Sequence, residues 1–210
     1  MIDLALLDCG IGNLHSASKA LALVGATPRL VSAPRTALTA QALVLPGVGA
    51  FDAAMVKLNA GGWREALLEA IAAGKPLLGI CIGMQVWFEG SEEGQLPGLG
   101  VIPGRVCRFR SEPQLTIPHM GWNQLTLTQP DCPLWQDCGP EPWVYFVHSY
   151  AGQPVHSPDI AATATHGRQT FTAAIARPPL FGVQFHPEKS AAVGLQILRN
   201  FVRYAESMYR

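Results

Sequence analysis

Residues 77–85 read LLGICIGMQ, and this stretch decides the fold. An apolar run of strand length ends in Gly-x-Cys-x-Gly and passes into a segment with helical character. This is the cysteine form of the nucleophile elbow, in which a strand turns sharply into a helix. The turn strains the backbone of the central residue, and Gly79 and Gly83 leave room for close packing beside it. We therefore expect Cys81 to lie where a strand of a parallel sheet meets a helix.

The elbow would give Cys81 the properties of a nucleophile. At a helix N-terminus, unpaired N–H groups and the helix dipole favour the thiolate. The backbone N–H of Ile82 points at the same place and can stabilise an oxyanion. The pentapeptide is also compatible with a buried structural cysteine, since free cysteine is among the most buried residue types.

Outward from the elbow, the first half of the chain alternates short apolar strands with helical patterns. Helices are expected to end near Gly25, Gly61 and Gly74, with Asp52 as the N-cap of the second. Strands that alternate with helices predict a parallel sheet with helices on both faces. The expected strands are residues 2–7, 29–32, 42–45 and 77–80.

The second half of the chain is richer in strands. Residues 129–142 are expected to form a loop with one short helical turn, and a helix is expected from Ala191. The composition never shifts enough to mark a linker, so we predict a single domain over residues 1–210. The predicted class is α/β, an open, mostly parallel mixed sheet with helices on both faces. The further strands are residues 101–109, 122–128, 143–148, 171–175 and 180–185.

Composition excludes several classes of protein. The 210 residues carry 15 basic and 15 acidic side chains, so the chain has no electrostatic footprint for nucleic acid. Five cysteines without a C-x-x-C pair argue against a disulfide framework and a structural zinc site. No apolar run approaches the ~18 residues of a membrane span, and the N-terminus lacks the basic region of a secretory signal. We expect a cytoplasmic protein without metal or cofactor, whose lightly charged surface at zero net charge favours a protein partner.

A general base for Cys81 is found at the end of a distant strand. Of the six histidines, only His186 ends an apolar strand, in the segment GVQFHPE. Glu188 follows two residues later, and we expect Pro187 to keep the chain extended so that both side chains point the same way. Glu188 can then orient the imidazole while its other nitrogen faces Cys81. A structural histidine at a strand end beside a solvated glutamate is the alternative.

Two glycine-rich turns follow other strands. In LPGVGAF, residues 45–51, the N–H of Val48 can complete an oxyanion hole, although a plain strand–helix turn also fits. The glycines Gly47 and Gly49 make this loop easy to rearrange, so the hole can require a partner to form. In DCGIGN, residues 8–13, a dinucleotide-binding loop is excluded because its third glycine would fall on His15.

Together, the cysteine elbow, the strand-end HPE and the PGVG turn resemble the class I, triad-type glutamine amidotransferases, which have a flavodoxin-like fold. Within that family the chain is similar to the glutaminase subunits of imidazole glycerol phosphate synthases, from Asp8 to Phe201. Cys9 and Ile82 depart from the usual aromatic and leucine, but neither side chain would react. The likeness is carried by DCGIGNLHS (8–16), LPGVGAF (45–51), GICIGMQ (79–85), SEEG (91–94), PHMGWN (118–123), YFVHSY (145–150) and GVQFHPEKS (182–190).

The resemblance implies a role for each matching residue. Cys81 would be the nucleophile, His186 the general acid and base, and Glu188 the residue that orients His186. The N–H groups of Val48 and Ile82 would hold the oxyanion. The substrate site would be lined by Gly49, Gln85, Ser149 and Tyr150.

The resemblance also implies a reaction and a partner. The enzyme would hydrolyse glutamine to glutamate and ammonia through a cysteinyl thioester. Ammonia released into water would be mostly ammonium, so it must pass directly to a second active site. The family's partner is a (β/α)₈-barrel cyclase, which forms a heterodimer with the glutaminase and makes imidazole glycerol phosphate and aminoimidazole carboxamide ribotide in histidine biosynthesis. We expect the interface at the active-site edge, around Asn13, Met120, Trp122 and Lys189.

Three other interpretations remain open. The chain can be the glutaminase of another pathway, such as anthranilate synthase, although PHMGWN disfavours this. It can be a stand-alone cysteine hydrolase, a peptidase or γ-glutamyl hydrolase that needs no partner. It can also be a non-catalytic docking subunit, which would have no need of Cys81, His186 and Glu188 together.

Overall fold

The structure is a computed structural model that describes residues 2–210 of the chain. Its centre is an eight-stranded sheet, parallel over its first five strands and antiparallel over the rest. This is the α/β class with a mostly parallel mixed sheet that the alternating pattern predicts. In spatial order the strands are β2 (Arg29–Val31), β1 (Leu4–Leu7), β3 (Ala42–Gly47), β4 (Leu77–Cys81), β13 (Leu180–Val183), β12 (Gln169–Arg177), β11 (Ile160–His166) and β8 (Thr126–Leu127).

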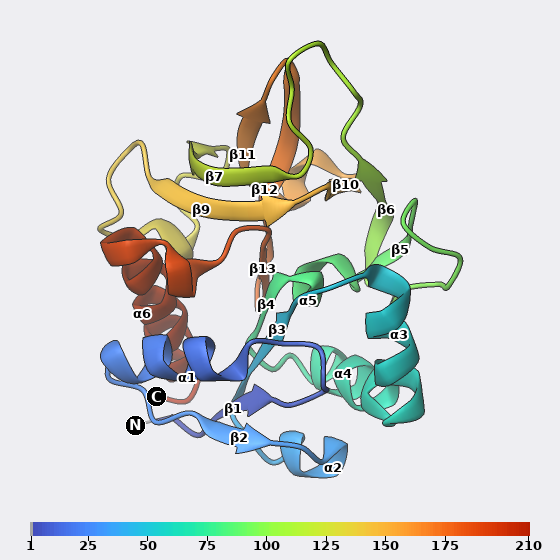
Figure 1. Ribbon diagram of the computed structural model, residues 1–210. Helices are drawn as coiled ribbons and strands as arrows, with labels where there is room; N and C mark the ends of the chain where they lie inside the picture. The colour runs from blue at the N-terminus through green and yellow to red at the C-terminus, as the bar shows by residue number, and fades with distance from the viewer. Residues whose placement is uncertain (1) are drawn as a thin grey trace.

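Helices cover both faces of the parallel strands. In Figure 1, α1 (Leu14–Leu23) and α6 (Ala191–Ser207) lie on one side, and α3 (Phe51–Ala60) and α4 (Trp63–Ala72) lie on the other. The short α2 (Pro34–Ala37) packs beside α4. Both faces of these parallel strands are therefore buried, which explains why β1, β3, β4 and β13 are continuous apolar runs.

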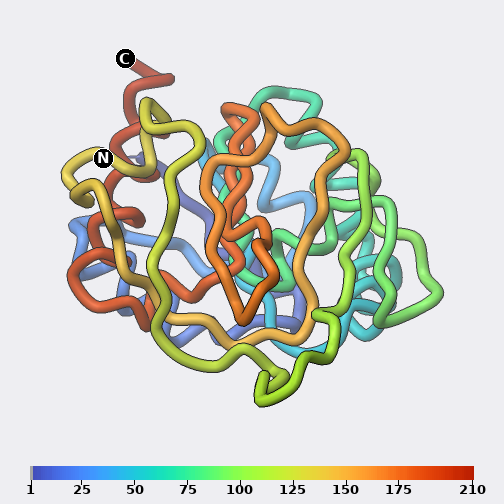
Figure 2. Tube along the Cα trace, turned by 90° about the horizontal axis from the view of Figure 1, so that it is seen from above, coloured from blue at the N-terminus to red at the C-terminus, as the bar shows by residue number. Residues whose placement is uncertain are grey.

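Two small sheets stand beyond the central one. One is formed by β5 (Phe88–Ser91), β6 (Ile102–Arg108) and β10 (Tyr150–Pro154), and the other by β7 (His119–Gln124) and β9 (Trp143–His148). In Figure 1 the β7–β9 ribbon crosses above the upper ends of β4 and β13. Figure 2 shows, from above, the green segment near residue 95 and the yellow segment near residue 135 on opposite sides of the molecule.

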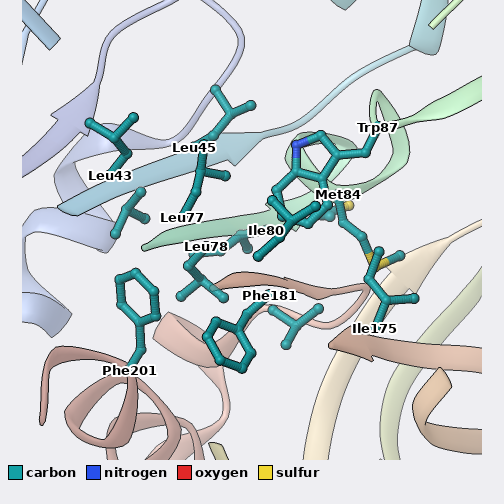
Figure 3. Packing of buried hydrophobic residues seen from close by; sticks show 14 of the residues in the cluster. Leu43, Leu45, Leu77, Leu78, Ile80, Met84, Trp87, Ile175, Phe181 and Phe201 are labelled. Atoms are coloured by element: carbon teal, nitrogen blue, oxygen red, sulfur yellow. The ribbon is translucent and has the colours of Figure 1, made fainter. Parts of the chain in front are cut away.

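The core explains why glycines stand in two central strands. Gly79 of β4 and Gly182 of β13 are paired in register, and the ring of Trp87 packs over both. A Cβ atom at either position would collide with that ring. In Figure 3, Phe181 and Phe201 lie on the other side of β4, and their ring centroids are 6.2 Å apart. The sheet around the elbow is thus packed closely from both faces.

The structure differs from the sequence-based expectations at several points. Asp52 is not an N-cap, because Ala50 holds that position and the Asp52 carboxylate accepts instead from the backbone N–H groups of Gln95 and Leu96. The expected strand over residues 122–128 is two strands, β7 and β8, separated at Leu125. Strands β5, β10 and β11 were not expected. The expected turn of helix within residues 129–142 is the 3₁₀ helix η1 (Pro133–Trp135).

Candidate active site

The elbow at Cys81 has the strained backbone that its sequence predicts. Cys81 ends β4 with φ 55° and ψ −112°, a region that residues with side chains rarely adopt. Gly83 packs so closely on β3 that a Cβ there would collide with the carbonyl of Leu45. The following helix, α5 (Ile82–Gln85), has only four residues, so a helix dipole contributes less at Cys81 than the sequence suggests.

Neighbouring strands bring His186 to the same edge of the sheet. β13 runs parallel to β4, with Val183 opposite Ile80, and the chain continues from β13 to His186. The Nδ1 atom of His186 lies 2.8 Å from Oε1 of Glu188, and both side chains are only 4% exposed. The expected extended backbone between them is wrong, because Glu188 lies in the 3₁₀ helix η3 (Pro187–Lys189). The tight turn nevertheless brings the carboxylate onto the ring.

The surroundings of His186 favour its charged form. Burial alone lowers the pKa of this imidazole, but the neighbouring Cys81 sulfur and the Glu188 carboxylate outweigh burial and raise it to about 10. The ring Nε2 makes no hydrogen bond within residues 2–210. That nitrogen is therefore available for proton exchange with a ligand or with Cys81.

A cavity of about 310 Å³ opens onto these groups. It contains every residue that the family resemblance assigns to the oxyanion hole and the substrate site, whereas Glu188 lies behind His186. Its size suits a small polar ligand. Its lining consists of Val48, Gly49, Cys81, Ile82, Gln85, Glu93, Pro118, Val147, His148, Ser149, Tyr150 and His186.

One expected oxyanion donor is engaged elsewhere. The N–H of Val48 donates to the carbonyl oxygen of Ile11 at 2.5 Å, so in this conformation it is not free to hold an oxyanion. The side chain of Val48 is half exposed, and the space beside Gly49, at φ +97°, is open. The loop therefore has room to rearrange, as its glycines suggest.

Gln85 is held at the cavity by a network of amides. Its Nε2 donates to the carbonyl of Tyr150 at 3.1 Å and to Oε1 of Gln184 at 2.9 Å. Its Oε1 is buried and has no hydrogen-bond partner in the described chain. Gln85 lines the cavity, and a buried acceptor without a partner is rare enough that a donor from a ligand is expected there.

Three residues at this site were missed by sequence reasoning. Glu93 and His148 line the cavity, and Gln184 donates from Nε2 to the Sγ of Cys81 over 3.6 Å. Gln184 stands two residues before His186, and alternation along the strand expected over residues 180–185 would put both side chains on one side. That spacing was a usable signal for Gln184. Glu93 lies in the SEEG segment, which carries the family likeness but has no pattern of its own.

The residues expected at the partner interface are all exposed. Met120 and Trp122 stand on β7, which pairs with β9 at the cavity. Asn13 caps α1, accepting from the N–H of Ser16, and Lys189 lies in η3, which packs against α1. The structure therefore leaves these side chains free to contact another chain.

The remaining cysteines are unlike Cys81. Burial raises the pKa of the thiols of Cys9, Cys107, Cys132 and Cys138, and all are free. Cys107 and Cys138 are half-buried, whereas Cys9 and Cys132 are buried. No cluster of metal-ligating side chains occurs in residues 2–210, and none of the helices described there has the length and apolarity to cross a membrane.

Comparisons with known proteins agree with this geometry. The model of the class-I glutamine amidotransferase family matches residues 5–205. The chain is 57% identical to the imidazole glycerol phosphate synthase subunit HisH of Gloeobacter violaceus, over 98% of this chain and 91% of that protein. It is 59% identical to the HisH subunit of Synechococcus elongatus, over 95% of this chain and 92% of that protein.

Solved structures share the fold at low identity. PurLQS from Thermotoga maritima superposes with a TM-score of 0.74 at 18% identity, over 97% of this chain and 99% of that chain. The glutaminase domain of Trypanosoma brucei CTPS with bound acivicin gives a TM-score of 0.66 at 15% identity, over 97% and 94%. The family model matches nearly the whole chain, and the cysteine elbow and the sheet order agree with it. The chain therefore belongs to the class-I glutamine amidotransferase family.

Proposed function

We propose that this chain is the glutaminase subunit of an imidazole glycerol phosphate synthase, folded as a single catalytic domain and acting in the cytoplasm. The observation that carries the proposal is the cavity in which Cys81, at a strained elbow, meets the buried His186–Glu188 pair. The relatives that match nearly the whole chain carry the name of this subunit.

The proposed chemistry follows from the groups at the cavity. The Cys81 thiolate attacks the side-chain amide carbon of glutamine, and His186 protonates the leaving nitrogen so that ammonia departs. Water, activated by His186, then hydrolyses the thioester to release glutamate. Glu188 orients the imidazole through Nδ1 and stabilises its cation, which leaves Nε2 for the proton transfers.

The amide network supports a glutamine site. The unpartnered Oε1 of Gln85 is suited to accept from the α-ammonium group of the substrate. Gly49 and the backbone of Ser149 and Tyr150 line the same cavity and would contact the rest of the amino acid. The N–H of Ile82 would hold the oxyanion, joined by Val48 once its bond to Ile11 is released.

The need to protect ammonia from protonation requires a second chain. We propose a cyclase of the (β/α)₈-barrel type, bound as a heterodimer around Asn13, Met120, Trp122 and Lys189. The engaged N–H of Val48 supports a further expectation, that docking is needed to complete the oxyanion hole. Removal of one such donor typically costs about 100–1000-fold in rate.

Glutamate release, measured with and without the cyclase and its nucleotide substrate, tests the proposal. We expect weak release from the chain alone and release roughly 100-fold or more faster in the complex. Cys81→Ala should abolish the glutamine-dependent synthesis and leave the ammonia-dependent synthesis by the cyclase intact. Equal rates with and without the cyclase would favour a stand-alone cysteine hydrolase instead, and turnover by Cys81→Ala would remove Cys81 as nucleophile.

A further inference from the structure

Gln184 stands at the junction between the proposed nucleophile and the proposed substrate site. It follows β13 directly, is fully buried, and its backbone N–H is fixed to the carbonyl of Ala173 at 2.9 Å. Phe185, the next residue, packs against Phe146 in the core. Gln184 and His186, on either side of Phe185, both reach Cys81. One short segment therefore supplies two side chains to the same sulfur.

The polarity of the Gln184 amide is fixed by its surroundings. The carbonyl of Tyr150 can only accept, so the Gln85 atom that faces it must be the donor Nε2. That nitrogen also lies 2.9 Å from the Gln184 amide, which must present its acceptor Oε1 there. The remaining end of Gln184 is consequently Nε2, a donor, and it lies 3.6 Å from Sγ of Cys81.

We propose that Gln184 is a positioning residue that stabilises the Cys81 thiolate and locks Gln85 toward the substrate. The proposal rests on the glutaminase function above and adds a second side chain, beside His186, that acts on the sulfur of Cys81. The amide is neutral at every pH, so it supports the thiolate without competing for the proton.

Burial makes this hydrogen bond strong. Cys81 is only 5% exposed, so little water is present to replace a missing donor to its sulfur. Hydrogen bonds to a charged acceptor are roughly twice as strong as those between neutral groups. Loss of the donor Nε2 of Gln184 would therefore reduce the thiolate population of Cys81. Loss of its acceptor Oε1 would remove one of the two hydrogen bonds that hold Gln85.

Alkylation of Cys81 tests the proposal without any need for turnover. The full chain is treated with iodoacetamide across a pH series, and labelling of Cys81 is followed by peptide mass analysis. In Gln184→Met, which keeps the length and removes both polar atoms, we expect the midpoint of the labelling profile to move up by about one to two pH units. The half-buried Cys107, labelled in the same samples, is an internal reference whose profile should not move.

Two further variants separate positioning from folding. Gln184→Asn keeps an amide but is too short to reach both partners, so it should shift the midpoint in the same direction even if Gln184→Met fails to fold. Asn200→Leu removes a buried amide of α6 that bonds the carbonyl of Leu134, away from the cavity, and should leave the midpoint where it is in the wild type.

Kinetics of the complex with the cyclase complete the test. For Gln184→Met we expect kcat for glutamate release to fall about ten- to a hundredfold and KM to rise severalfold, because Gln85 is no longer held. A folded Gln184 variant with an unchanged midpoint would overturn the proposal. If the wild-type complex released no glutamate, the proposed function would fail, while the alkylation profiles would still decide the role of Gln184.

Discussion

His186 and His148 line the same cavity, and both are buried, yet their pKa values move in opposite directions. Glu188 and the Cys81 sulfur raise the pKa of His186 to about 10. Burial lowers the pKa of His148 to about 3, only partly offset by its bond to the Tyr150 carbonyl. Burial alone thus keeps an imidazole neutral, and an anion in contact reverses this effect.

The hydrogen bonds around His148 agree with a neutral ring. Its Nδ1 donates to the carbonyl of Tyr150 at 2.8 Å, so its Nε2 is free to accept from Nδ1 of His119 at 3.1 Å. The Nε2 of His119 in turn faces the amide nitrogen of Asn123 at 3.3 Å. A proton added to either ring would break this chain, so His148 and His119 support the cavity wall, and His186 alone is equipped to exchange protons.

Removal of the Glu188 carboxylate should have the largest effect, because it makes the surroundings of His186 resemble those of His148. In Glu188→Gln, only Cys81 still opposes burial, so we expect the pKa of His186 to fall. Loss of the orienting anion typically lowers turnover by roughly 10²- to 10⁴-fold. Steady-state glutamate release in the complex measures this. The exposed Glu92→Gln is the matched control and should keep wild-type turnover; similar losses in both variants would contradict the role of Glu188.

The pH dependence of stability tests the other half of the comparison. Burial lowers the pKa of His119 to about 4 and that of His148 to about 3, below the roughly 6.5 of an unfolded histidine. The unfolded chain therefore binds more protons at acidic pH, and stability present above pH 6.5 is lost as the pH falls toward 4. We expect each histidine to remove roughly 1.4 kcal/mol per pH unit from the free energy of unfolding in that range.

Urea unfolding between pH 7 and 4 measures this slope. In His148→Gln one titrating group is lost, so the slope should become shallower by roughly 1.4 kcal/mol per pH unit. The exposed His156→Gln is the control and should keep the wild-type slope. A slope in His148→Gln as steep as that of the wild type would show that His148 is not held neutral.

The smallest effect is expected from the group that fixes the backbone of His186. The buried hydroxyl of Ser190 donates to the carbonyl of His186 at 2.7 Å and accepts from the N–H of Tyr145 at 2.9 Å. Ser190→Ala leaves both backbone groups without this partner and should cost about 1–3 kcal/mol of stability. Turnover should fall less than tenfold, since Glu188 still holds the ring. A loss of activity as large as that of Glu188→Gln would mean that the backbone, not the carboxylate, positions His186.

The ends of apolar strands in the sequence correctly predicted that Cys81 and His186 lie at the same edge of the sheet. Cys81 ends β4, and His186 follows the neighbouring parallel strand β13 by three residues. The sequence locates both because buried parallel strands are short apolar runs bounded by glycine or proline. The fold class and the family resemblance are confirmed by the family match and the sheet order. The roles assigned to the site residues remain predictions.

The sequence was less informative where local pattern and tertiary contact disagree. Only the turn residues Val86 and Trp87 separate β5 from the one-turn helix α5, so no glycine or proline marks where β5 begins. β11 is built largely of alanine and threonine, so it does not alternate clearly between apolar and polar residues. The engagement of the Val48 N–H by Ile11 joins residues that are far apart in the chain, and no local pattern encodes it. Glu188 was placed correctly for the wrong reason, since η3 rather than an extended chain brings it to His186.

The position of β13 has a consequence for how such enzymes diversify. β13 is hydrogen-bonded on both sides, to β4 and to β12, so the segment leading to His186 starts from an interior strand. The β7–β9 ribbon, in contrast, is a two-stranded sheet of its own and carries Met120 and Trp122 outward. Substitutions at the outward-facing Met120 and Trp122 can therefore adapt the ribbon to a new companion protein, while the inward side of β9, where the Tyr145 carbonyl accepts from the N–H of His186, stays unchanged.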